Sequence, residues 1–191
     1  MASEVLGNEP SVHPTAIVED GASVGLDTRI WHRSHIRAGS TIGERCTIGF
    51  SVYVDTDVVI GDGCKIQNHV SLYQGVTLED DVFVGPSVAF TNDLHPRARS
   101  DAWEVVPTFV RSGASIGANA TIVCGVEIGA NAMIAAGAVV TGDVRAHALV
   151  MGAPGRIAGW VCVCGHTLSR GDAEIPAVCA SCGRSTQGVG A

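Results

Sequence analysis

The sequence predicts an all-β fold built from short, stacked parallel strands, followed by a small cysteine-containing tail. Two observations predict the stack: an apolar residue recurs every six positions along most of the chain, and 24 of the 191 residues are Gly. Such a glycine content is typical of chains with many tight turns. A third observation, two close pairs of cysteines near the C-terminus, predicts the tail.

The six-residue repeat begins at Val12, reaches Phe90 without a break, and continues from Val110 to Ala146. With an apolar fraction of 46%, chance would produce the first run with a probability of about 2 in 100,000. The residue two places before each repeat position is small and uncharged, with Pro10 at the start as the one departure. One large and one small inward residue per six describe a short strand and a sharp corner, so each strand pairs with the strand one coil away.

Charge and cysteine usage narrow the range of partners. The net charge is −7, and the 12 basic residues form no cluster, so neither nucleic acid nor an anionic membrane is expected as a partner. No apolar run reaches the roughly 18 residues of a membrane span, and Met1 to Pro10 lack the apolar core of a signal peptide. Seven cysteines without such a signal predict reduced thiols in the cytoplasm, with Cys46 and Cys64 as core residues.

Residues 91–107 interrupt the repeat with the densest polar cluster of the chain. A loop that projects from a regular stack usually has a function. The polar and aromatic residues of this loop are Asn92, Asp93, His95, Arg97, Arg99, Asp101 and Trp103.

The stretch GDGCKIQNHVSLYQGVTLEDDVFVGPSVAFTNDLHPR, residues 61–97, resembles the hexapeptide-repeat nucleotide-sugar N-acetyltransferases. This family includes enzymes that act on UDP-2-acetamido-3-amino-2,3-dideoxy-glucuronate and on dTDP-3-amino sugars. The stretches HPTAIVEDGASVG at 13–25 and VMGAPGRIAGW at 150–160 match its beginning and end. The resemblance implies that residues 1–160 form a left-handed parallel β-helix of about seven coils, three hexapeptides to a coil, in a homotrimer.

The resemblance also implies the reaction: acetyl-CoA acetylates the 3-amino group of a nucleotide-linked amino sugar, in cell-surface polysaccharide or glycoside biosynthesis. Asn92 matches the residue that contacts the reacting sugar. An amide orients an amine but cannot take its proton, so we expect Asn92 to position the amine. His95 is the candidate general base, ranked below direct attack by the neutral amine. The remaining acceptor-binding residues are expected to be Lys65, Gln67, His69, Tyr73, Asp93 and Arg97.

Small residues near the end of the repeat are expected to bind acetyl-CoA, the acetyl donor. Ala135, Ala136, Gly137 and Gly152 would let pantetheine approach the backbone closely, and a backbone N–H of residues 134–140 would stabilise the thioester oxyanion. Arg156 is expected to meet a CoA phosphate.

Residues 161–191 are predicted to form a small tail resembling a zinc ribbon. Cys162, Cys164, Cys179 and Cys182 form two close pairs, each followed by Gly, which suits four thiolates around a structural Zn²⁺. So short a segment holds no core without such a staple. Two disulfides or free thiols are the alternatives, and His166 is expected to be a bystander.

Two other functions stay open from the sequence. A γ-class carbonic anhydrase has the same solenoid and binds zinc through three His, for which His32, His35 and His69 are the nearest set, although their order and spacing differ from that family. A non-catalytic β-helix scaffold is the other, and binding of acetyl-CoA would exclude it.

Overall fold

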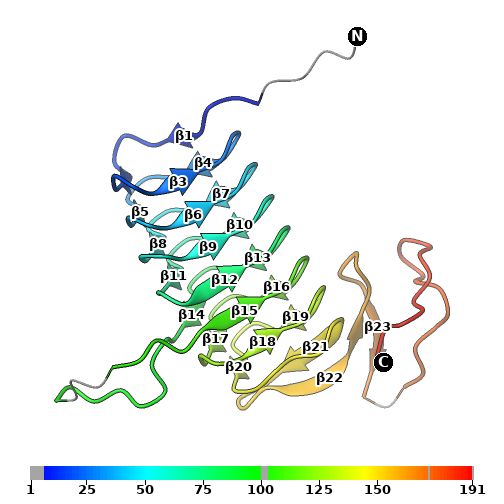
Figure 1. Ribbon diagram of the computed structural model, residues 1–191. Coiled ribbons are helices and arrows are strands. Elements are labelled where there is room, and N and C mark those ends of the chain that lie inside the picture. Colours follow the sequence, from blue (N-terminus) through cyan, green and yellow to red (C-terminus); the bar gives the residue numbers. More distant parts are fainter. Residues whose placement is uncertain (1–6, 100–102, 172, 191) are drawn as a thin grey trace, which may run out of the picture.

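The computed structural model describes residues 7–99, 103–171 and 173–190. These residues form 23 short strands and no helix, so none of them lies in a helix that could span a membrane. The strands lie on three sheets that follow one another around a column (Figure 1). The predicted all-β stack is confirmed.

The three sheets take their strands in turn from successive coils. Sheet A contains, in order, β1 (Ser11–Val12), β4 (Arg29–Ile30), β7 (Thr47–Ile48), β10 (Lys65–Ile66), β13 (Phe83–Val84), β16 (Ser115–Ile116), β19 (Met133–Ile134), β21 (Ala148–Met151), β22 (Arg156–Val161) and β23 (Thr167–Arg170). Sheet B contains β2 (Ile17–Val18), β5 (His35–Ile36), β8 (Tyr53–Val54), β11 (Ser71–Leu72), β14 (Ala89–Phe90), β17 (Thr121–Ile122) and β20 (Val139–Val140). Sheet C contains β3 (Ser23–Val24), β6 (Thr41–Ile42), β9 (Val59–Ile60), β12 (Val76–Leu78), β15 (Thr108–Val110) and β18 (Glu127–Ile128). Three strands make one coil, so the described chain forms seven coils, and β21 is the first side of an eighth.

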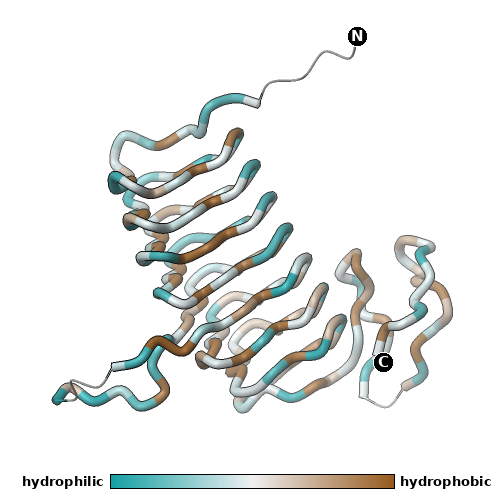
Figure 2. Tube along the Cα trace, viewed as in Figure 1, coloured by the Kyte–Doolittle hydropathy of each residue, from teal (hydrophilic) through white to brown (hydrophobic). Residues whose placement is uncertain are grey.

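The register between coils explains the six-residue repeat. Ile30 pairs with Ile48 and Ile48 with Ile66, each 18 residues further along. The repeat residues therefore stack on one another inside the column, where Ile48 and Ile66 are fully buried. Hydrophobic segments recur in the same place from coil to coil in Figure 2. This ladder of aliphatic side chains forms the single core.

The second inward position accepts only small residues. The polar ones among them are buried, and all but Thr108, whose hydroxyl has no partner among the described residues, find one. The buried hydroxyls of Thr28 and Ser34 donate to the carbonyl oxygens of Gly43 and Gly49 in the next coil, at 2.8 and 2.6 Å. Cys46 and Cys64 occupy the same position, and both are buried. Their predicted role as core residues is confirmed.

Two irregularities change the coil length. β15 pairs with β12 through Leu78 and Val110, 32 residues apart instead of 18, so the loop between β14 and β15 is inserted into one coil, as predicted. The second irregularity corrects the sequence analysis. Val144, not Ala146, pairs with Ile128, because the last coil is two residues shorter; Val144 is buried and Ala146 is exposed.

The tail continues sheet A. β22 pairs antiparallel with β21, and β23 pairs antiparallel with β22. The proposed boundary at 160/161 falls inside β22, and Val161 is fully buried, with its N–H donating to the His147 carbonyl oxygen at 2.8 Å. Trp160 packs on the core, and the Arg145 guanidinium lies 4.7 Å from the centre of its ring. The tail therefore rests on the last coil and covers its end.

We predict that the corners tolerate no extra carbon. A Cβ at Gly61 would lie 2.7 Å from the Glu79 carbonyl carbon in the next coil, so Gly61→Ala should lower the midpoint of thermal unfolding by roughly 3–10 °C, as overpacking of about 1–3 kcal/mol implies. Gly142→Ala is the matched control, because its Cβ would meet nothing within 4 Å. Equal melting temperatures for the two variants in calorimetry would contradict the packing argument.

Candidate functional site

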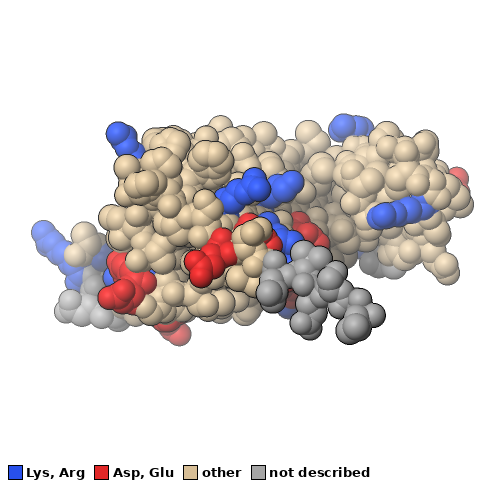
Figure 3. Space-filling model, turned by 90° about the horizontal axis from the view of Figure 1, so that it is seen from above, with Lys and Arg blue, Asp and Glu red and all other residues tan. Residues whose placement is uncertain are grey.

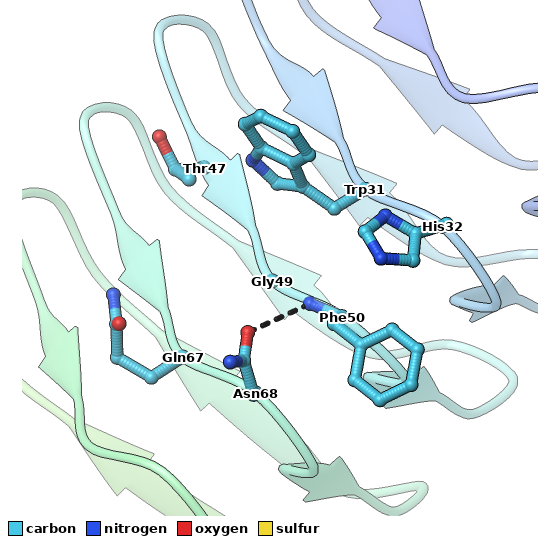
Figure 4. A pocket seen from close by; sticks show the side chains of 7 residues that line it. All are labelled: Trp31, His32, Thr47, Gly49, Phe50, Gln67 and Asn68. Carbon is cyan, nitrogen blue, oxygen red and sulfur yellow. Dashed lines mark hydrogen bonds between the residues drawn. The ribbon is translucent and has the colours of Figure 1, made fainter.

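Two hollows lie one after the other along the edge where sheet A turns into sheet B, hereafter the A–B edge. The first has a volume of about 420 Å³ and is lined by residues from the second to the fourth coil (Figure 4). These residues are Trp31, His32, Thr47, Gly49, Phe50, Gln67 and Asn68. The second, of about 490 Å³, extends from β13 to β23. We call them the aromatic hollow and the apolar groove.

The aromatic hollow combines flat rings with free amides. Trp31 follows β4, and 48% of its surface is exposed. The Phe50 ring lies between the rings of His32 and His69, each 5.0 Å away centre to centre. The Asn68 Oδ1 accepts a hydrogen bond from the Phe50 N–H at 2.9 Å, which leaves its amide NH₂ to donate (Figure 4). Such a hollow suits a planar heterocycle with hydrogen-bonding edges.

The apolar groove has small residues along one wall and a cation at one end. Its lining residues are Phe83, Ser115, Ile116, Gly117, Met133, Ile134, Ala135, Ala136, Leu149, Met151, Thr167 and Arg170. The Ala136 N–H donates to no backbone carbonyl of the described residues. The groove runs across the strands, along the column axis, and so suits an extended chain that carries amide groups.

Lys65 lies on the strand between the two hollows and lines neither of them. It is exposed on β10, which lies between β7 at the aromatic hollow and β13 at the apolar groove. The predicted residues Lys65, Gln67 and His69 therefore share one edge with Ala135 and Ala136. We call the two hollows, with Lys65 between them, the track.

The loop lies at the opposite edge of sheet B, where sheet B turns into sheet C, and it projects away from the column (Figure 1). Its base is closed by the Val106 N–H, which donates to the Asn92 carbonyl oxygen at 3.0 Å. The half-buried Asn92 side chain donates from Nδ2 to the Gln74 carbonyl oxygen at 3.4 Å. Its Oδ1 has no protein donor among the described residues, so it can accept a hydrogen bond from a ligand.

A polar network supports the base of the loop. The Asp55 carboxylate accepts hydrogen bonds from the Tyr53 hydroxyl at 3.1 Å and from the Gln74 N–H at 3.4 Å, and it pairs with Arg37 at 3.2 Å. Burial opposes ionisation of Asp55, but these donors and the Thr56 N–H outweigh it and lower its pKa. Asp55 thus anchors Gln74, whose carbonyl oxygen accepts the hydrogen bond from Asn92.

The other loop residues are more exposed. The His95 N–H donates to the Asp93 side chain at 2.7 Å, whereas the exposed imidazole has no hydrogen-bond partner among the described residues. Arg97 donates to the Pro96 carbonyl oxygen at 2.7 Å, and Arg99 is exposed. Tyr73 lies at the same edge, 5.9 Å from Tyr53 centre to centre. Asp101 lies outside the described residues.

The predicted site residues thus fall into two groups. Tyr73, Asn92, Asp93, His95 and Arg97 lie at or beyond the edge between sheets B and C, and the track lies at the A–B edge. Within one chain, sheet B therefore separates the two groups of residues.

Three residues predicted to bind acetyl-CoA, namely Gly137, Gly152 and Arg156, are not among those that line the apolar groove. Arg156 lines a separate hollow and donates to the Gly155 carbonyl oxygen at 2.8 Å. Gly152 occupies the turn after β21, where its φ of +91° favours glycine. Gly137 follows Ala136 at a corner.

Sequence reasoning missed Trp31, Phe50 and Arg170. They stand at corner or tail positions, where the repeat prescribes no side chain.

Figure 3 shows charged side chains in small, separate groups on the face seen from above.

The four tail cysteines converge on one point. Their sulfur atoms all lie within 4.8 Å of one another, with Cys162 Sγ 3.6 Å from Cys182 Sγ and Cys164 Sγ 3.8 Å from Cys179 Sγ. The thiols are free, and the Cys182 N–H, with that of Ser181, lowers the pKa of Cys179 to about 6. A tetrahedron of Zn–S bonds of about 2.3 Å needs sulfur separations of about 3.8 Å. The cluster therefore fits a zinc ion.

Among the described residues, these cysteines are the only group of three or more His, Cys, Asp or Glu close enough to share a metal. His32 and His69 flank Phe50, whereas His35 faces Glu19 on sheet B at 2.7 Å. The three imidazoles of the carbonic anhydrase alternative therefore do not converge within one chain.

Known proteins share the repeat. Residues 107–142 match the family described as bacterial transferase hexapeptide (six repeats), and residues 39–74 match the hexapeptide repeat of succinyl-transferase. The chain is 44% identical over 173 residues to dTDP-3-amino-3,6-dideoxy-alpha-D-galactopyranose 3-N-acetyltransferase of Aneurinibacillus thermoaerophilus, covering 91% of this chain and 88% of the relative. It is 32% identical to serine acetyltransferase of Bacillus subtilis, over 68% of this chain and 50% of that protein.

Solved structures share the fold. A hexapeptide-repeat acetyltransferase of Vibrio cholerae in complex with acetyl coenzyme A superposes with a TM-score of 0.50 and 33% identity, over 59% of this chain and 69% of that one. A variant of GDP-perosamine N-acetyltransferase from Caulobacter crescentus superposes with a TM-score of 0.51 and 24% identity, over 80% of this chain and 58% of that one.

Proposed function

This chain belongs to the hexapeptide-repeat acetyltransferases, and from that premise we propose that it transfers an acetyl group from acetyl-CoA to the 3-amino group of a nucleotide-linked amino sugar. The observation that carries the proposal is the track, which offers one hollow to a nucleotide base and an adjoining groove to an extended thioester. The 44% identity to a dTDP-3-amino sugar N-acetyltransferase over nine-tenths of the chain supports the acceptor class.

The two hollows divide the substrates between them. The nucleobase stacks on Trp31 or Phe50, and the Gln67 and Asn68 amides pair with its edge. Lys65 lies next on the track, where it meets the diphosphate. Pantetheine extends through the apolar groove, and the Ala136 N–H donates to one of its amide carbonyls. Acetyl-CoA as donor and reduced tail thiols both suit the cytoplasm.

The reaction needs an amine held against a thioester. The nitrogen lone pair attacks the acetyl carbonyl carbon, the new C–N bond forms, and the C–S bond breaks. The CoA sulfur leaves as a thiolate and is protonated as the amine loses its proton. Asn92 Oδ1 accepts from an amine N–H and thereby aims the lone pair, while the exposed His95 has no group to orient it as a base.

The separation of the two groups supports a homotrimer with the site between protomers. The loop of one protomer would reach the track of its neighbour, as three-fold symmetry allows. Leu94 and Trp103, with exposed fractions of 47% and 53%, give the loop an apolar surface that such a contact would cover.

We predict that mixed oligomers test this arrangement. Asn92→Ala disables the loop and Trp31→Ala disables the track, so each variant alone should lose most activity. Co-refolded in equal amounts, they should regain about a quarter of the wild-type activity, because that fraction of interfaces pairs an intact loop with an intact track. Activity that remains at the mean of the two variants would place the whole site within one chain.

We predict that Asn92→Ala lowers kcat/KM by about 100-fold, because the amine loses its orientation. His95→Asn should lose less than tenfold and keep the pH–rate profile. An obligatory base would instead cost about 100- to 10,000-fold and remove the acidic limb. Steady-state kinetics of both variants distinguishes the two roles. A larger loss of kcat/KM for His95→Asn than for Asn92→Ala would make His95 the catalytic residue.

We further propose that the cysteine cluster holds one structural Zn²⁺. Elemental analysis of protein purified without chelator should find one zinc per chain. Cys164→Ser should lose that zinc, whereas Cys124→Ala, a buried cysteine of the solenoid, should keep it. Zinc-free wild-type protein would refute the assignment.

A further inference from the structure

We propose that the cysteine tail is part of the donor site: β23 places Arg170 at the end of the apolar groove to bind a phosphate of CoA, and the metal cluster holds β23 there. This inference rests on the proposed function, because it takes the groove as the acetyl-CoA site. It replaces Arg156, the arginine expected from the sequence, with an arginine of the tail.

The groove itself points to Arg170. Thr167 and Arg170, both on β23, line it together with Ala135, Ala136 and Met133. The Arg170 guanidinium donates a weak hydrogen bond to the Met151 sulfur, at 3.9 Å, and no carboxylate of the described residues pairs with it. A guanidinium with no anion beside it among the described residues can bind a phosphate through two N–H groups.

Arg156 is less well placed. It lines the hollow formed by Thr141, Asp143 and Ile157, not the apolar groove, and its Nη1 already donates to a backbone carbonyl oxygen. Asp143 in the same hollow would repel a phosphate. The tail therefore offers the better cation for the donor.

The metal cluster fixes the strand that carries Arg170. Cys162 and Cys164 lie in the turn between β22 and β23, and the Cys162 N–H donates to the His166 carbonyl oxygen at 2.9 Å, next to the start of β23. Cys179 and Cys182 come from a later segment of the tail, and their sulfur atoms lie within 4.8 Å of those of Cys162 and Cys164. A metal that joins the two pairs closes the hairpin turn.

The hairpin also rests on the groove wall. Gly159 pairs with Arg170, and a Cβ at Gly159 would lie 2.1 Å from the Ser169 carbonyl oxygen, so the two strands approach closely there. Gly165 in the turn lies against Met133, whose Cε would be 3.5 Å from an added Cβ. Displacement of the turn would therefore move both Arg170 and one side of the groove.

The first test is direct binding of CoA by titration calorimetry at fixed ionic strength. Arg170→Ala should raise the Kd of CoA about tenfold, as the loss of one ion pair with phosphate implies. It should not change the Kd of S-acetylpantetheine, which carries no phosphate. Arg184→Ala, in the tail but outside the groove, is the control and should bind both ligands as the wild type does.

The outcomes separate this inference from the proposed function. If the wild type binds neither ligand, the proposed function fails. If the wild type binds CoA but Arg170→Ala binds it equally well, or if Arg156→Ala shows the tenfold loss instead, only the role of Arg170 is overturned.

The second test removes the metal. Chelated wild type should bind CoA about tenfold more weakly, and Arg170→Ala should lose nothing further on chelation, because both changes remove the same contact. Binding of S-acetylpantetheine reports whether the groove is still folded. Independent, additive losses would show that the metal does not act through Arg170 and would overturn the coupling.

Discussion

The structure depends on the close stacking of successive coils. Strands of neighbouring coils lie about 4.8 Å apart, and the corners approach so closely that a Cβ at Gly25 would lie 2.5 Å from the carbonyl carbon of Gly43. This spacing demands one large and one small inward residue on each of the three sides of a coil. It also makes the column rigid and regular, so the chemistry resides in whatever departs from the repeat.

In the proposed function, three departures from the repeat carry the chemistry. The outward corner residues between sheets A and B form the track, the inserted loop supplies Asn92, and the tail closes the groove with β23. The loop and the track lie on opposite edges of sheet B, so the regular column itself keeps them apart. In the proposed trimer, a second copy would bring its loop to the track, so assembly and catalysis would be linked.

The sequence predicts the core well because the core is periodic. Fourteen repeat positions in a row specify the strands, their partners one coil away and the place of the insertion. The same rule fails at Ala146, because a shortened coil moves Val144 into the stack without any change in composition. Arg170 and Trp31 were missed for a different reason: corners and tails have no period, and only the folded chain shows which of them face a hollow. The four cysteines were predicted together because their chemistry, not their place in the repeat, identifies them.

A crystal structure with CoA and a nucleotide-linked amino sugar bound together tests most directly the claim that the track is the active site. We expect the base beside Trp31, the CoA sulfur toward Phe83 and a CoA phosphate beside Arg170, with Asn92 of a neighbouring protomer at the sugar amine. CoA bound in the reverse direction, or a sugar amine contacted only by residues of the chain that holds its base, would contradict it.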